Sequence, residues 1–353
     1  MVFSSGDGPW FAFLTHPRDI ADLTRWKGSR LMREYSADDD DFLRKVNTME
    51  PVVIGDLLFG MGGPRGELVG VMRMPDVLLK DGGREAVAEG LRVAAARGAK
   101  VVGLGAWTAP VTAAGRTLLH GAPDGVTITT GNAYTAAVSR HNVVEAVEAL
   151  DLRRQARVAV LGATGSVGVP ASHLLVQEGF DVTLIGRTEG RLKVTVGDLA
   201  PVARLTTGLG HLREADVVLV LTSDKTSLVR PEHVSDGAVI IDVAQPVNIP
   251  RSSHDLFEAK GVCVVEGGLV RIPGYRSTYD LAITDPYSTF ACLGETYLLS
   301  RDGAREHSVG PIEPSTSLRM ERIAAWHGVR PAPLDLADRR LPRTPPEAAA
   351  AAS

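Results

Sequence analysis

Apolar residues in this chain gather into short runs that are separated by stretches of mixed character. In the second half of the chain such runs lie within residues 158–161, 181–187, 215–221, 238–242 and 261–265. Short apolar runs are typical of strands buried on both faces, and helical segments between them are typical of parallel sheets. The pattern therefore predicts a Rossmann-like, doubly wound parallel sheet.

The first half of the chain repeats this alternation on a smaller scale. Apolar runs predict strands within residues 10–14, 52–59, 67–74, 101–105 and 126–129. Apolar residues at helical spacing predict helices over residues 18–32, 84–98 and 132–150. The acidic stretch at residues 36–41 is predicted to be a loop. The fold class is therefore α/β, with a smaller N-terminal α/β domain ahead of the Rossmann-like sheet.

A glycine-rich turn follows the first strand of the second half. Gly162, Gly165 and Gly168 are spaced as G-x-x-G-x-x-G between a predicted strand and a predicted helix. We expect Gly162 to permit a tight turn, Gly165 to let the backbone approach a pyrophosphate, and Gly168 to let the helix pack on the strand. A purely structural turn is the alternative. The predicted cofactor-binding residues here are Gly162, Ala163, Thr164, Gly165, Ser166, Val167 and Gly168.

The end of the next strand indicates which dinucleotide binds. An acidic residue there would hold the ribose 2′-hydroxyl of NAD, but Arg187 stands at this position, with Thr188 and Arg191 close behind. Cations and a hydroxyl suit a 2′-phosphate, so the sequence predicts NADPH as the cofactor. The alternative is a solvated arginine at a strand end.

Ligands of open parallel sheets bind beyond the carboxyl ends of the strands. Four residues at the ends of later strands are therefore further cofactor-binding candidates, with strand termination as the alternative for each. They are Thr222, Ser223, Asp242 and Gly267.

The pattern divides the chain into four regions. We predict an N-terminal substrate-binding domain over residues 9–138, an NADP-binding Rossmann domain over 139–285, C-terminal helices over 286–330 and a disordered tail over 331–353. The tail is rich in Pro and Ala, which favours disorder.

Composition narrows the function classes. A net charge of −4 excludes a strongly basic nucleic-acid binder, and two cysteines give neither a disulfide framework nor a zinc pattern. We see no signal peptide and no apolar run long enough to span a bilayer. The sequence therefore predicts a cytoplasmic protein with no metal site.

Cys292 is the candidate nucleophile. It lies in a predicted helix that starts near Pro286, in the second turn, where the helix dipole mildly favours a thiolate. A small core residue is the alternative for Cys292. Core packing is the expected role of Cys263, which lies between valines in a strand.

From about Trp10 to Arg330 the chain resembles the long-chain acyl-[acyl-carrier-protein] reductases. The segments that carry the resemblance are Phe11–His16, Gly103–Thr108, Thr129–Thr135, Val160–Gly168 and Phe290–Cys292. The resemblance implies NADPH-dependent reduction of an acyl thioester, carried on acyl carrier protein or coenzyme A, to an aldehyde. It implies a cysteinyl acyl-enzyme on Cys292 and an aldehyde-consuming enzyme as a further partner. It also places four substrate candidates around the site, each with a structural alternative: His16, Thr108, Asn132 and Tyr134.

Other classes compete with this interpretation. An NADP-dependent alcohol or ketone dehydrogenase built like shikimate dehydrogenase also has its nucleotide domain second, but no convincing lysine stands in the motif for its Lys–Asp pair. No Tyr-x-x-x-Lys indicates a short-chain dehydrogenase, and the N-terminal cysteine of glutamyl-tRNA reductases is lacking. A non-catalytic NADP-binding protein is the alternative from outside the enzymes.

Overall fold

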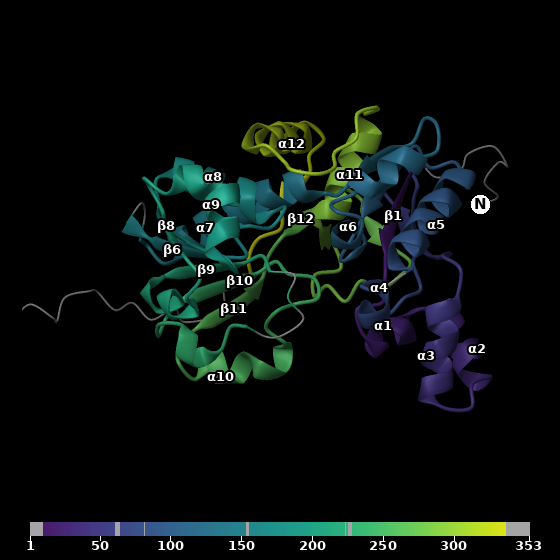
Figure 1. Cartoon of the computed structure of the whole chain (residues 1–353), viewed down its shortest axis with the longest axis horizontal. Coiled ribbons are helices and arrows are strands. Elements are labelled where there is room, and N and C mark those ends of the chain that lie inside the picture. Colours follow the sequence, from purple (N-terminus) through teal and green to yellow (C-terminus); the bar gives the residue numbers. More distant parts are fainter. Residues whose placement is uncertain are drawn as a thin grey trace, which may run out of the picture. The chain divides into compact units, whose positions relative to one another are not determined.

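The computed structural model describes residues 10–60, 64–80, 82–152, 155–222, 224 and 228–336 (Figure 1). The chain forms two compact units. Unit 1 takes the chain as far as Ser139, together with Val169–Ala171 and Gly268–Ala332. Unit 2 takes Arg140–Gly168, Ser172–Gly267 and the chain from Pro333 onward.

Unit 2 is built on a six-stranded, fully parallel sheet. Its strands are β6 (Arg157–Leu161), β7 (Asp181–Ile185), β8 (Arg204–Thr206), β9 (Val217–Val220), β10 (Val239–Asp242) and β11 (Cys263–Glu266). They lie in the order β8-β7-β6-β9-β10-β11, which is 3-2-1-4-5-6 along the chain and is the order of the Rossmann fold. The predicted α/β fold class is confirmed.

Helices cover both faces of this sheet, α8 and α9 on one side and α10 on the other (Figure 1). Their bounds are α8 (Gly168–Glu178), α9 (Glu189–Val196) and α10 (His254–Glu258). Every residue of β9 and β10 is buried as a result, which is why these strands are continuous apolar runs. Short 3-10 helices lie in the connections: η3 (Gly197–Leu199), η4 (Leu209–Glu214), η5 (Pro231–His233) and η6 (Arg251–Ser253).

Unit 1 contains a second six-stranded sheet, in the order β13-β2-β3-β1-β4-β5. Its strands are β1 (Phe11–Thr15), β2 (Val52–Leu58), β3 (Gly66–Gly70), β4 (Val101–Leu104), β5 (Thr127–Thr129) and β13 (Arg276–Ser277). The strands β3, β1, β4 and β5 are parallel, and β2 and β13 are antiparallel to their neighbours. A smaller antiparallel sheet pairs β12 (Leu269–Arg271) with β14 (Ser288–Phe290) and β15 (Arg330–Pro331).

The two faces of the larger sheet of unit 1 pack into separate cores. Because side chains alternate along a strand, Phe11 and Phe13 face one core while Ala12 and Leu14 face the other. The first core contains α11 (Ala291–Arg301), and the ring of its Tyr297 stacks on Phe59 at a centroid distance of 4.4 Å. The second core contains α5 (Gly83–Ala96). α7 (Asn132–Ala149) starts on the first core and continues into unit 2.

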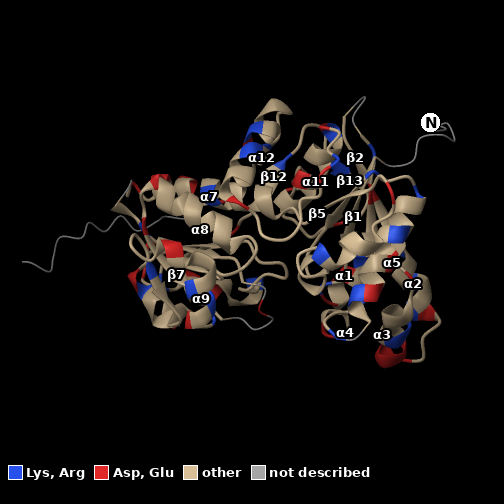
Figure 2. Ribbon diagram, turned by 45° about the horizontal axis from the view of Figure 1, so that its top comes forward, with Lys and Arg blue, Asp and Glu red and all other residues tan. Residues whose placement is uncertain are grey.

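The remaining helices of unit 1 are short, apart from α12. Their bounds are α1 (Ile20–Arg25), α2 (Lys27–Glu34), α3 (Asp39–Thr48), α4 (Pro75–Leu78), α6 (Thr108–Val111), the 3-10 helix η1 (Arg116–Gly121) and α12 (Pro314–Trp326). Basic and acidic residues are interspersed along the helices (Figure 2). Among the described residues, no helix combines the length and apolar character that a membrane crossing requires.

Three local predictions differ from the structure. The acidic stretch expected to be a loop contains the start of α3, because Asp38 caps that helix by accepting the N–H of Asp41 at 2.8 Å. Acidic residues in a first turn also interact favourably with the helix dipole, so Asp39–Asp41 stabilise the helix rather than prevent it.

The helix expected from about Pro286 begins later, at Ala291. Residues Ser288–Phe290 instead form β14, which pairs with β12. Cys292 therefore lies in the first turn of α11 rather than the second. The predicted helix over 18–32 is likewise divided into α1 and α2 at Trp26, whose ψ of 118° is extended.

The structural units also differ from the regions expected from the sequence. Residues 268–285, assigned to the Rossmann domain, lie in unit 1, and residues 286–330 join the same unit. The reason is that β12 and β13 pair with strands of unit 1. Of the predicted tail, residues 337–353 lie outside the described residues.

Candidate functional site

The glycine turn of unit 2 joins the end of β6 to the start of α8. Gly162 has a φ of 94°, and a Cβ atom there would lie 2.8 Å from the carbonyl carbon of Leu221. Only glycine adopts this conformation and this close approach without strain. A Cβ atom at Gly168 would overlap the carbonyl oxygen of Gly162, so α8 also begins too close to the turn for a side chain.

The middle of the turn is open. Thr164, Gly165 and Val167 are half-buried and Ser166 is exposed. Val167 is the N-cap residue of α8 and makes no side-chain capping hydrogen bond. The first N–H groups of a helix bind phosphate when no cap occupies them. The predicted pyrophosphate contacts stay predictions, and the geometry of the turn suits them.

The side chain of Asp242, at the end of β10, binds the backbone of the loop that follows this strand. Its carboxylate accepts the backbone N–H groups of Ala244, Asn248 and Ile249 at 3.1, 2.7 and 2.8 Å. Burial raises the pKa of this carboxyl to about 6, even though the three N–H donors oppose the shift. These contacts favour the structural alternative for Asp242.

The other three cofactor-binding candidates at this edge of the sheet are Thr222, Ser223 and Gly267. The Oγ1 atom of Thr222 accepts the N–H of Asp224 at 3.2 Å. A Cβ atom at Gly267 would overlap the side chain of Ile241. Ser223 lies outside the described residues. Thr222 and Gly267 thus have local structural roles.

The predicted cationic cluster contains two accessible charges, Arg187 and Arg191. Arg187 lies beyond the end of β7, its side chain is 79% exposed, and its guanidinium is 3.6 Å from the carboxylate of Asp224. Thr188 is the N-cap residue of α9, and its Oγ1 accepts the N–H of Arg191 at 3.4 Å. The Thr188 hydroxyl therefore serves the helix, whereas Arg187 and the exposed Arg191 can meet an anion.

In unit 1, Cys292 lies where the first turns of α11 and α7 meet. It is the second residue of α11. Gly131, which precedes α7 and has a φ of 71°, packs directly against it, so that a Cβ atom at position 131 would overlap Cys292. Two segments far apart in sequence are thus brought together at this thiol.

The Cys292 thiol is protonated at neutral pH. Burial raises its pKa to about 12, although the backbone N–H groups of Leu293 and of Cys292 itself lower it. From the position of Cys292 in the helix, the sequence predicts that the helix dipole mildly favours a thiolate. The structure gives the opposite direction, because the loss of hydration on burial exceeds the stabilisation that one helix end supplies.

Glu295, one turn after Cys292, is a polar residue that the sequence analysis missed. It is fully buried. Its carboxylate accepts the hydroxyls of Thr129 and Ser308 at 2.6 and 2.9 Å and the N–H of Tyr134 at 2.8 Å. Burial raises the pKa of this carboxyl, and the hydrogen bonds oppose the rise. Glu295 therefore fixes the start of α7 beside α11. The available signal was an acidic residue in the middle of a helix whose other charged residue, Arg301, stands at its end.

His16 has no free ring nitrogen. Its Nε2 atom accepts the N–H of Trp107 at 3.2 Å, so Nδ1 carries the proton and donates to the carbonyl of Pro17 at 2.9 Å. Burial lowers the pKa of His16 to about 4. The buried Thr108 hydroxyl donates to the carbonyl of Gly105 at 2.7 Å. Both residues thus have structural roles in the β1–β4 region.

Asn132 and Tyr134, in the first turn of α7, differ from each other. The Asn132 side chain is half-buried and makes no hydrogen bond with any described residue, so it can meet a ligand. Tyr134 is buried, and its hydroxyl has no hydrogen-bond partner among the described residues. Burial raises the pKa of this phenol.

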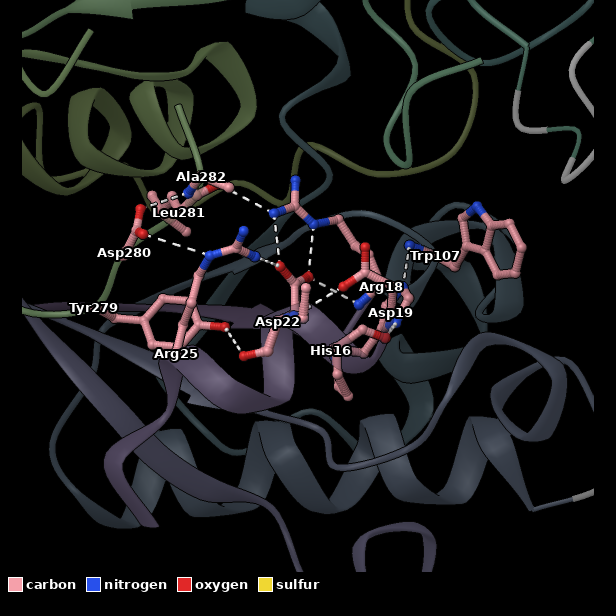
Figure 3. A network of polar contacts seen from close by, with 12 residues as sticks. His16, Arg18, Asp19, Asp22, Arg25, Trp107, Tyr279, Asp280, Leu281 and Ala282 are labelled. Carbon is pink, nitrogen blue, oxygen red and sulfur yellow. Dashed lines mark hydrogen bonds and ion pairs between the residues drawn. The ribbon is translucent and has the colours of Figure 1, made fainter. Parts of the chain in front are cut away.

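A network of ion pairs and hydrogen bonds lies beside His16 (Figure 3). Asp22 pairs with Arg18 at 2.7 Å and with Arg25 at 2.6 Å, and Arg25 also reaches Asp280. The Tyr279 hydroxyl donates to the carbonyl of Asp22 at 3.0 Å. The network fastens the segment 279–282 to α1. Because its arginines are paired with carboxylates, its role is structural.

A comparison with protein families finds a match that covers most of unit 2. Residues 145–264 match the family described as Shikimate / quinate 5-dehydrogenase. Aminotransferase PigE of a Serratia species is 24% identical over 94% of this chain and 41% of its own length. Bifunctional protein FolD of Ralstonia nicotianae is 31% identical over 34% of this chain and 36% of its own length. The chain therefore spans about two fifths of the length of these curated relatives.

Solved structures also resemble the chain. The match with shikimate dehydrogenase from Aquifex aeolicus covers 91% of this chain and 100% of that protein, with 14% identity and a TM-score of 0.40. The match with a transhydrogenase from Sinorhizobium meliloti covers 43% of this chain and 56% of that protein, with 17% identity and a TM-score of 0.30.

These matches overturn the resemblance to acyl-[acyl-carrier-protein] reductases. The family that matches is a dehydrogenase family, and the relative that aligns with most of the chain is named an aminotransferase. The assignment as an aldehyde-forming acyl-thioester reductase is wrong. The five segments that suggested it are short, and one of them is the glycine turn, which dinucleotide-binding proteins share. The shikimate-dehydrogenase-like alternative, with a Rossmann-like NAD(P)-binding fold, agrees better with the matches.

Proposed function

We propose that this chain is an NAD(P)-dependent oxidoreductase that interconverts an alcohol and a carbonyl compound, with NADPH as its preferred cofactor. The observation that carries the proposal is the open glycine turn at the carboxyl edge of a 3-2-1-4-5-6 parallel sheet, with the exposed Arg187 after the neighbouring strand. The turn suits a pyrophosphate, and an arginine at this position suits a 2′-phosphate. The match of residues 145–264 to a dehydrogenase family supports the reaction class.

The activity stated in the name of the longer relative, PigE, is chemically compatible with this reaction class. PigE is named an aminotransferase. Transamination exchanges an amino group with a carbonyl group. An alcohol–carbonyl oxidoreductase is the class of reaction that supplies or removes such a carbonyl compound.

Unit 1 supplies the candidate groups for the substrate. A bound dihydronicotinamide would supply hydride to the carbonyl carbon. The half-buried Cys292 thiol at the start of α11 and the half-buried Asn132 side chain at the start of α7 are our candidates for contacting the substrate.

The cofactor assignment is tested by titrating the full chain with NADPH and NADH in a calorimeter. We expect NADPH to bind more tightly. Arg187→Gln should weaken NADPH binding about tenfold, the value of one lost charge-assisted contact, and leave NADH binding unchanged. Arg230→Gln, which removes an exposed arginine before β10, is the matched control. A wild-type chain that binds neither nucleotide contradicts the proposal.

The reaction class is tested by following NADPH absorbance with a panel of ketones, aldehydes and hydroxy acids. Cys292→Ala should lower kcat/KM about tenfold on the best substrate, the size of one lost substrate contact, without changing the Kd for NADPH. Tight NADPH binding with no turnover of any compound would indicate the non-catalytic NADP-binding alternative instead.

A further inference from the structure

The ion pair between Arg187 and Asp224 joins two loops of unit 2 that are not neighbours in the sheet. Arg187 follows β7, and Asp224 follows β9. In the sheet order, β6 lies between these two strands. Adjacent strands are about 4.8 Å apart, so the ends of β7 and β9 are about 10 Å apart. The two side chains nevertheless approach to 3.6 Å. They therefore reach toward each other across the end of β6.

The end of β6 is where the glycine turn begins, and the same two loops border that turn. On one side, Gly162 donates its N–H to the carbonyl of Ile185, the last residue of β7, at 3.0 Å. On the other side, Gly162 approaches Leu221 and Thr222, which follow β9. Arg187 and Asp224 thus connect the two borders of the turn that is proposed to hold the cofactor.

The pair is held loosely enough to open. The Arg187 side chain is 79% exposed and that of Asp224 is 28% exposed. Exposed ion pairs of this kind contribute little to stability and are weakened by salt. The backbone N–H of Asp224 makes a separate contact, a hydrogen bond to the Oγ1 of Thr222 at 3.2 Å, which does not involve the carboxylate.

We propose that Asp224 is a specificity-determining residue, which competes with the 2′-phosphate of NADPH for Arg187. The inference rests on the proposed NADPH site. While Asp224 holds Arg187, the positive charge of the guanidinium is neutralised. A 2′-phosphate carries close to two negative charges and must both displace the carboxylate and lie near it. NADH carries a hydroxyl at this position, so its binding needs neither step. Asp224 consequently reduces the preference for NADPH over NADH.

The test compares Asp224→Asn with the wild-type chain by calorimetric titration with NADPH and with NADH. Asparagine keeps the size of the side chain and removes the negative charge. We expect the Kd for NADPH to fall about two- to fivefold, the range for one exposed ion pair, and the Kd for NADH to stay constant. The gain should shrink as the salt concentration rises. Glu232→Gln removes a carboxylate from another exposed ion pair of unit 2, ahead of β10, and should change neither Kd.

Two outcomes separate this inference from the proposed function. If Arg187→Gln weakens NADPH binding but Asp224→Asn leaves the ratio of the two Kd values unchanged or lowers the preference for NADPH, the competition is overturned and the cofactor assignment stands. If Arg187→Gln leaves NADPH binding unchanged, the assignment of NADPH to this site fails, and the competition fails with it. In the double variant the gain from Asp224→Asn should vanish, because Arg187 is no longer available to the phosphate.

Discussion

In unit 2 the groups proposed to meet the pyrophosphate of the cofactor come from one continuous turn between β6 and α8, whereas in unit 1 the groups around Cys292 come from distant parts of the chain. Glu295 bonds to Tyr134 and Thr129, which are 161 and 166 positions away in sequence. The turn of unit 2 depends on backbone conformation at Gly162 and on close approach at Gly168. The arrangement in unit 1 depends on one buried carboxylate.

This difference determines which kind of substitution should disrupt each candidate site. A glycine turn fails when a side chain is added to it, because backbone and neighbouring loop leave no space. A buried carboxylate that accepts several hydrogen bonds fails when it is removed, because its donors are left without partners in a dry environment. The following predictions test these two dependences, in decreasing order of expected effect.

Replacing Glu295 by leucine should give the largest effect. The hydroxyls of Thr129 and Ser308 and the N–H of Tyr134 would lose their acceptor, at a cost of about 3–5 kcal/mol in the free energy of unfolding of unit 1. The four tryptophans of the chain, Trp10, Trp26, Trp107 and Trp326, all belong to unit 1, so urea unfolding followed by tryptophan fluorescence measures it.

Glu295→Gln is the matched control, since it keeps one acceptor oxygen for the two hydroxyls. It should cost about 1–2 kcal/mol. A leucine variant as stable as the wild-type chain would show that the start of α7 does not depend on this carboxylate.

Gly162→Ala should give the next largest effect, in unit 2. The φ of 94° and the 2.8 Å approach to Leu221 both oppose a Cβ atom, and we expect a loss of about 2–3 kcal/mol together with the loss of nucleotide binding. Thermal unfolding by circular dichroism and NADPH titration measure the two effects.

Gly190→Ala is the control for this change. A Cβ atom at Gly190, inside α9, meets no atom within 4 Å, so alanine should stabilise the helix by up to about 1 kcal/mol. Equal losses in the two variants would mean that the turn has no special conformational requirement.

The buried His16 gives unit 1 a pH dependence that can be isolated by substitution. Its pKa is lowered from 6.5 to about 4, so between these values the unfolded chain binds a proton that the folded chain does not. Stability therefore falls as the pH falls through this window, by at most about 3 kcal/mol. The measurement is urea unfolding of unit 1 at several pH values from 7 to about 4.5.

His16→Gln should remove this part of the pH dependence. Asp22, in the same unit, has a lowered pKa and loses its contribution only below 3.8, outside the window. Identical pH slopes in the variant and the wild-type chain would contradict the prediction.

Five strands of each six-stranded sheet and the glycine turn could be predicted from the sequence because their signals are local, whereas the short strands β8 and β13 were not predicted. Continuous apolar runs such as Val217–Val220 follow from burial on both faces, and the spacing of Gly162, Gly165 and Gly168 follows from what a tight turn permits. The resemblance to acyl-[acyl-carrier-protein] reductases failed for a related reason. Short local motifs indicate a turn and a cofactor class, but not the reaction.

Helix starts were harder to predict. The start of α11 was misplaced because Ser288–Phe290 pair with β12, a contact that no local pattern reveals. Glu295 was overlooked because a single acidic residue in a helix is usually exposed. Its role depends on Thr129, Tyr134 and Ser308, which come from other segments.

The sequence by itself determined that the second unit is a parallel α/β sheet with a dinucleotide-type turn. The reason is that the apolar runs and the spacing of the glycines are patterns formed by residues close together in the sequence. Only the tertiary structure decided the state of the side chains at the candidate sites. Burial raises the pKa of the Cys292 thiol and lowers the pKa of His16 because distant segments cover these groups, and desolvation depends on what covers a group rather than on its neighbours in sequence.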